Sequence, residues 1–211
     1  MSALPDQPPL LDQVLLARYE RLLRDLGLPL NESTRPGLSD AELAALADPL
    51  PFGLPLEARA WWGWRDGTYP GRPAWVFGPG RGCLSLSRAV EMHRRSRASA
   101  HEFASEPGLV GPRSDPDFMW RPGWLPILSD GQLKTAIDCD VAEGDPSPVS
   151  FVDFVTQPEE YAQEKARSFG ELIGWWCLAL ECGAWRWDAE RLQWRADAAR
   201  LPADLQGSSL V

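Results

Sequence analysis

Three short apolar runs separated by tight turns constrain the fold of this chain more than any other feature. They lie at residues 124–128, 134–140 and 148–155, and the turn segments SDGQ and EGDPS separate them. Runs of this length, rich in β-branched and aromatic residues and bounded by Gly, Asp and Pro, are typical of strands joined by hairpins. The sequence therefore predicts an antiparallel meander in this part of the chain.

Helical periodicity dominates on both sides of the predicted meander. In residues 11–27, the apolar side chains of Leu11, Val14, Leu15 and Tyr19 begin a stripe at helical spacing, which continues to Leu26. Ser39 and Glu42 form the pattern of a capping box. Further helices are predicted at residues 39–48, at 55–64 with an end in the turn at 66–67, at 85–103 and at 157–180.

Two weaker strand patterns complete the prediction. Residues 74–77 have the composition of a short strand, and residues 185–194 form a terminal hairpin pattern. Helices come first, then strands, then a helix, without strict alternation of strand and helix. This order predicts an α+β fold with a mostly antiparallel sheet flanked by helices.

Several short motifs follow one another in an order that resembles the SUKH superfamily, named for fungal regulators of cell-wall synthesis and their bacterial relatives. In chain order these are GLP at residues 53–55, WRDG at 64–67, LSL at 84–86, Ala89 and Glu91, Trp120, WLPI at 124–127, DG at 130–131, Asp138, and SFGEL at 168–172. The resemblance covers about residues 38–180.

The resemblance implies a non-enzymatic protein-binding domain. Bacterial members look like immunity proteins that bind and neutralise polymorphic or contact-dependent toxins, many of which are nucleases or deaminases. With this resemblance, we expect four regions in the chain: a disordered lead-in (1–9), an N-terminal helical extension (10–37), a SUKH-like domain (38–182) and a C-terminal hairpin and tail (183–211). A regulatory scaffold that binds host proteins is the alternative within this class.

The charge of the chain narrows the class of partner. Its 211 residues carry a formal net charge of −9, which disfavours binding to nucleic acid or to an anionic membrane surface. A basic protein partner suits this sign, because acidic surfaces attract cationic ones. The sequence shows no leader pattern or membrane-spanning apolar run, and its four cysteines form no CxxC pair. We therefore expect a cytoplasmic location.

The densest group of carboxylates is Asp138, Asp140, Glu143 and Asp145. These residues can form a solvated strand end, a face that binds a partner, or a site for a hard cation such as Mg²⁺. Their spacing does not match an EF-hand loop, and we expect neither a metal nor a cofactor. A small metal-dependent enzyme that uses residues 138–145 is a further alternative.

Trp120 and Trp124 are the other candidate binding residues, because two indoles close in sequence can stack on a ligand or partner. They can also pack in the core, where Trp serves as a large anchor. His93 and His101, the two imidazoles of the chain, lack a nucleophile or carboxylate in a recognised catalytic pattern. We therefore expect no catalytic residues.

Overall fold

The computed structural model describes residues 7–72, 74–79, 82–130, 133–153, 165–203 and 205. It confirms the predicted α+β class, with helices packed around antiparallel sheets. The helices are α1 (Gln13–Asp25), α2 (Leu30–Ser33), α3 (Asp40–Ala47), α4 (Leu56–Trp64), α5 (Leu86–Ala104), α6 (Pro116–Met119) and α8 (Phe169–Glu181). The strands are β1 (Thr34–Pro36), β2 (Arg65–Thr68), β3 (Gly82–Cys83), β4 (Trp124–Ser129), β5 (Leu133–Asp138), β6 (Val149–Asp153), β7 (Lys165–Ala166), β8 (Trp185–Asp188) and β9 (Gln193–Ala196).

The predicted meander is the centre of the main sheet. Strands β4, β5 and β6 pair antiparallel in sequence order, and β3 and β7 extend the sheet at its two edges. The β4–β5 register shifts between Pro126 and Leu128, close to the one residue of β4 that has no N–H to donate. The pairing of β8 with β9 confirms the predicted C-terminal hairpin.

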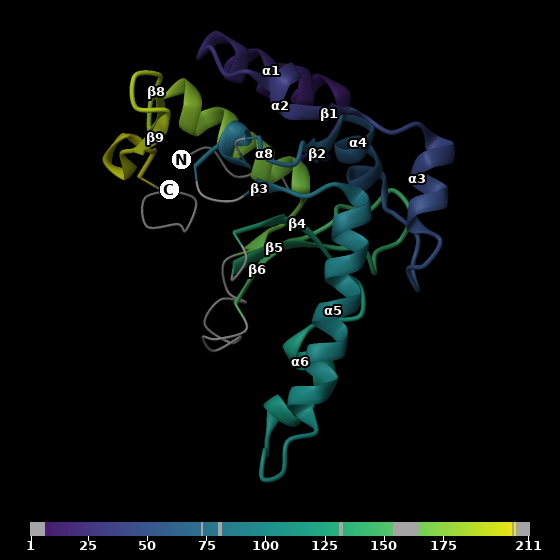
Figure 1. Cartoon of the computed structure of the whole chain (residues 1–211). Coiled ribbons are helices and arrows are strands. Elements are labelled where there is room, and N and C mark those ends of the chain that lie inside the picture. Colours follow the sequence, from purple (N-terminus) through teal and green to yellow (C-terminus); the bar gives the residue numbers. More distant parts are fainter. Residues whose placement is uncertain are drawn as a thin grey trace.

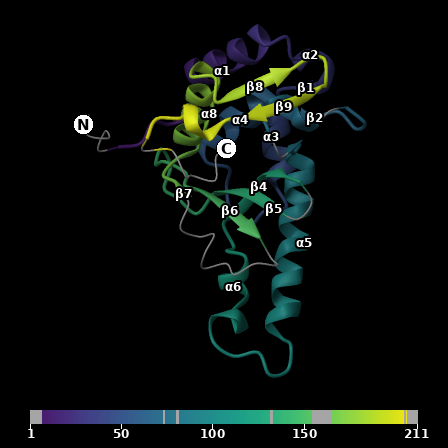
Figure 2. The same cartoon turned by 90° about the vertical axis from the view of Figure 1, so that its left-hand side faces the viewer.

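Helix α5 is the longest helix described and extends well beyond the sheet, with α6 beside its distal half (Figures 1 and 2). Helices α1 and α8 lie together on the opposite side of the molecule from this projecting part (Figure 1). Ser85 caps α5, and the predicted Ser39–Glu42 capping box is present at the start of α3. The capping-box pattern therefore predicted the start of α3 correctly.

Most apolar side chains meet in one main core. Leu16 of α1, Ile137 of β5 and Trp185 of β8 all belong to it, so the N-terminal helix and the C-terminal hairpin share the core of the sheet. Trp61 and Trp62 of α4 are fully buried there. A smaller core between α5, α6 and the sheet holds Ala100, Met119, Trp120, Trp124, Ala136 and Val152. No helix among the described residues is both long enough and apolar enough to cross a membrane.

Several local predictions are corrected by the structure. Residues Ala74–Phe77 form a 3₁₀ helix, η1, which buries both Val76 and Phe77, whereas a strand would point neighbouring side chains to opposite faces. Asp66 and Gly67 do not form a turn after α4 but lie in β2, and Asp66 Oδ1 accepts a hydrogen bond from Leu86 N at the start of α5.

The predicted helix at residues 157–180 begins only at Phe169, because β7 precedes it; residues 157–164 lie outside the described part of the chain. Residues 1–6 of the predicted lead-in and the turn residues 131–132 also lie outside it. Val14 and Leu56, which the helical stripes placed inside, are 77% and 49% exposed. Tertiary packing buries only part of each predicted apolar stripe.

Candidate functional site

The two predicted binding tryptophans lie inside the protein. Trp120 is fully buried and Trp124 is 6% exposed, and their rings stand perpendicular with centroids 5.7 Å apart. They lie in the smaller core, against α5 and the sheet. They therefore do not offer a partner an indole at the surface.

His93, which is 4% exposed, contacts both this tryptophan pair and Phe52. The carbonyl oxygen of Trp124 lies 2.8 Å from His93 Nδ1 and 3.2 Å from Trp120 Nε1. Because a carbonyl can only accept, Nδ1 carries the proton and donates it. The other side of the His93 ring meets Phe52 edge-on at 5.4 Å. Burial lowers the pKa of His93, Arg97 lowers it further, and the Trp124 carbonyl opposes this in part.

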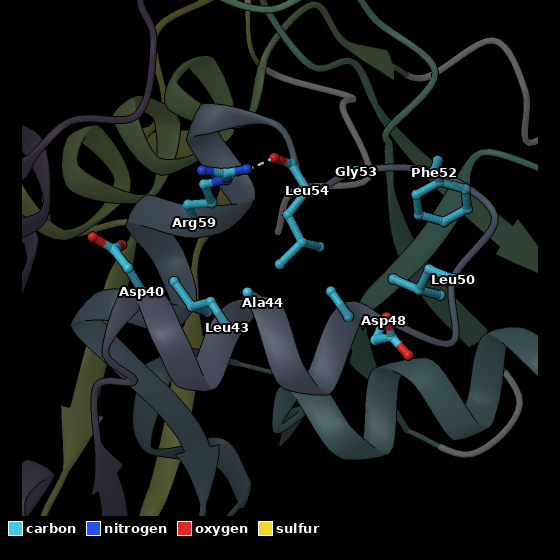
Figure 3. A pocket seen from close by; sticks show the side chains of 10 residues that line it. Asp40, Leu43, Ala44, Asp48, Leu50, Phe52, Gly53, Leu54 and Arg59 are labelled. Carbon is cyan, nitrogen blue, oxygen red and sulfur yellow. Dashed lines mark hydrogen bonds between the residues drawn. The ribbon is translucent and has the colours of Figure 1, made fainter.

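Phe52 belongs to a groove between α3 and the start of α4. The side chains of Leu43 and Ala44 on α3 face Leu54 across it, and Leu50 and Phe52 close one end (Figure 3). This hollow has a volume of about 260 Å³. The Nε of Arg59 donates a hydrogen bond of 2.9 Å to the Leu54 carbonyl and holds the wall in place. The floor of the groove is therefore apolar.

A second hollow of about 250 Å³ lies on the other side of residues 53–54. It shares Gly53, Leu54 and Arg59 with the first, and its far wall is made by Cys139, Val141, Ala142 and Glu143. We call the two hollows together the α3–α4 groove. The walls formed by α3 and residues 50–54 were not predicted from the sequence. One signal for them was present, since residues 43–54 hold more apolar side chains than a single helical stripe can bury.

The predicted acidic residues form the loop at the edge of this groove. β5 ends at Asp138, whose Oδ1 accepts a hydrogen bond of 3.1 Å from Asp140 N. Asp140, Glu143 and Asp145 are exposed. The loop packs against the corner at Gly123, where a Cβ atom would lie 2.8 Å from Asp140 Cβ. The structure thus places three of the four carboxylates at the surface, and Glu143 among them lines the second hollow, while Asp138 is half-buried.

The acidic residues around the groove form no ion pairs among the described residues. Asp40 and Asp48 line the first hollow and Glu143 lines the second. The described ion pairs all lie elsewhere, where Glu20 and Glu91 each pair with two arginines. The rim of the α3–α4 groove therefore carries three carboxylates without an ion pair, against the one guanidinium of Arg59, which lines both hollows. The first hollow has the more apolar lining.

A larger hollow of about 530 Å³ beside the start of α5 is lined by three arginines. Two of them have acidic partners within the chain, since Arg35 pairs with Asp66 and Arg88 pairs with Glu91. Its positive charge is therefore partly neutralised by ion pairs within the chain. Among the residues described, no three His, Cys, Asp or Glu side chains are close enough together to hold a metal ion.

No model of a known protein family matches the chain, and no curated protein matches it in sequence.

Proposed function

We propose that this chain is a non-enzymatic protein-binding module that acts in the cytoplasm and receives a basic protein partner in the α3–α4 groove. More specifically, we propose that the chain is an immunity protein that neutralises a polymorphic or contact-dependent toxin, such as a nuclease, by direct binding. The observation that carries the proposal is the apolar floor of the first hollow in a groove whose three carboxylates, Asp40, Asp48 and Glu143, outnumber the one guanidinium of Arg59. Such a surface attracts cationic partners and buries their apolar anchors.

The resemblance to the SUKH superfamily supports the same function. Gly53 and Leu54 of its GLP motif line both hollows, and Pro55 lines the second. Its LSL motif lies where Ser85 caps α5, and its WLPI motif lies in β4.

A regulatory scaffold remains the second candidate, because a host protein with a basic surface would suit the same groove. The two candidates differ in the identity of the partner, not in the site. The metal-dependent enzyme gains no supporting observation, since residues 138–145 form a loop around one side of a hollow and, within the described chain, no cluster suited to a metal is present.

Purification of the complex with the product of the neighbouring gene tests the immunity function. We expect the unmodified chain to co-purify with that product and to protect cells that express it. Absence of a complex together with absence of protection contradicts the immunity function. A complex with host proteins instead, and no toxin gene nearby, favours the scaffold.

A further inference from the structure

We propose that the occupant of the α3–α4 groove is an amphipathic α-helix of the basic partner, with two apolar anchors and cationic residues seven or eight positions apart. This inference rests on the proposed function and specifies the partner segment. Four properties of the groove carry it: the size of its hollows, the nature of its walls, the placement of its charges and the position of Leu54.

The size of the hollows favours side chains over a small-molecule ligand. Each hollow taken alone, at about 260 Å³ or 250 Å³, falls below the range of about 300–1,000 Å³ usual for ligand pockets and suits a single side chain. Leu54, which is 7% exposed, lines both hollows. Two small hollows that share a wall suit two anchor side chains from one segment.

The walls favour a helix over an extended peptide. An added strand needs a row of free backbone N–H and C=O groups, as at a sheet edge. No residue of a described strand lines either hollow, and the Leu54 carbonyl already accepts from Arg59 Nε. A helix makes its backbone hydrogen bonds internally and presents only side chains to a partner. It can therefore bind a groove whose walls are made of side chains.

The charges set the spacing expected in the partner. Asp40 begins α3 and Asp48 is its C-cap, so they lie about 12 Å apart along the helix axis. Figure 3 shows them at the two ends of the groove wall. A helix lying along α3 spans this distance with residues seven or eight positions apart, which is about two turns. Lys or Arg at those positions would meet both carboxylates.

The negative charge of Asp48 is also disfavoured by its position at the end of α3. The C-terminal end of a helix carries a partial negative charge, which a carboxylate there increases. The described part of the chain offers this carboxylate no ion pair. A cation supplied by the partner would relieve this repulsion.

A displayed library of helical peptides tests the inference with the full-length chain as bait. Each peptide has about 18 residues, enough for about five turns, with apolar residues three or four apart and Arg, Glu or Ser at random elsewhere. We expect the enriched peptides to carry paired Arg residues seven or eight apart. A proline placed at the centre of an enriched peptide should abolish its binding.

Three variants locate the binding site, with affinity measured by fluorescence anisotropy. Asp48→Lys should weaken binding of an enriched peptide by about tenfold, because an attraction becomes a repulsion. Ala44→Trp, which fills the first hollow from an exposed position on α3, should weaken it at least as much. Glu102→Lys, the same charge change on the distal part of α5, should leave affinity within about twofold.

Several results would overturn the helix assignment. These are the absence of any enriched peptide, enrichment of acidic peptides, binding that tolerates the proline, or equal losses in Glu102→Lys and Asp48→Lys. The toxin complex separates this failure from failure of the function. If Asp48→Lys and Ala44→Trp bind the toxin as tightly as the unmodified chain, the function stands and the groove assignment fails. If the chain selects basic helices but binds no toxin, the groove assignment stands and the immunity function fails.

Discussion

The carboxylate of Glu57 accepts a hydrogen bond of 2.7 Å from the backbone N–H of Gly170, a residue 113 positions further along the chain. The same buried carboxylate accepts from Leu11 N at 2.8 Å and from Ser147 N at 2.6 Å. One side chain of α4 therefore fastens the N-terminal segment, the loop before β6 and the start of α8. This junction lies in the interior, because Glu57 is only 1% exposed.

Glu57→Gln should lower the free energy of unfolding by about 2–3 kcal/mol. The new amide group replaces one accepting oxygen with a donor, and a buried N–H left without a partner costs about 1–3 kcal/mol. Urea denaturation followed by tryptophan fluorescence measures the change. Glu102→Gln, on the exposed part of α5, is the matched control and should change stability by less than about 0.5 kcal/mol. An equal effect of the two variants would contradict the role of Glu57.

Gly170→Ala should destabilise the protein, whereas Gly174→Ala in the same helix should not. A Cβ atom at Gly170 would lie 2.4 Å from the Pro9 carbonyl oxygen and from Leu10 C, which are backbone atoms that cannot turn away. Such overpacking costs about 1–3 kcal/mol. A Cβ atom at Gly174 meets nothing within 4 Å, so alanine there should add up to about 1 kcal/mol through its helix propensity. Thermal denaturation of both variants checks the pair, and equal shifts would disprove the close approach.

Stability should fall as the pH drops below about 6.5, the ordinary pKa of histidine. Burial lowers the pKa of His93 in the folded state, so between the folded and unfolded values the unfolded chain binds the additional proton. The contribution of neutral His93 is thus complete above pH 6.5 and is lost as the pH falls. Urea midpoints at pH 7.5 and 5.5 measure it. His93→Gln should flatten this dependence and His101→Gln, at an exposed position, should preserve it.

Removing the charge of Asp48 should stabilise the free protein, and removing that of Asp40 should destabilise it. The first carboxylate lies at the C-cap of α3 and the second in its first turn, where the helix dipole acts with opposite sign. Asp48→Asn and Asp40→Asn should each shift the free energy of unfolding by about 0.3–1 kcal/mol, in opposite directions. Both should weaken partner binding. Shifts of the same sign in stability would mean that the dipole does not govern these positions.

Local signals predicted much of the secondary structure. The predicted capping residue Ser39 stands where α3 begins, and the apolar runs of β4, β5 and β6 pair in the predicted order. Each of these features depends on residues within a few positions, so periodicity and turn chemistry suffice to predict it. The acidic loop beside the groove was also visible as a cluster of carboxylates, although its neighbours in space were not.

What the sequence determined by itself was therefore the α+β class, the main helices, the meander, the C-terminal hairpin and the negative charge of the chain. Only the tertiary structure decided that Trp120 and Trp124 lie inside, that residues 74–77 form a 3₁₀ helix, and that α3 and loop 138–145 border one groove. Burial and grooves arise from residues distant along the chain, as the link from Glu57 to Gly170 illustrates. Periodicity describes which face of an element is apolar, but packing against other elements decides how much of that face is covered.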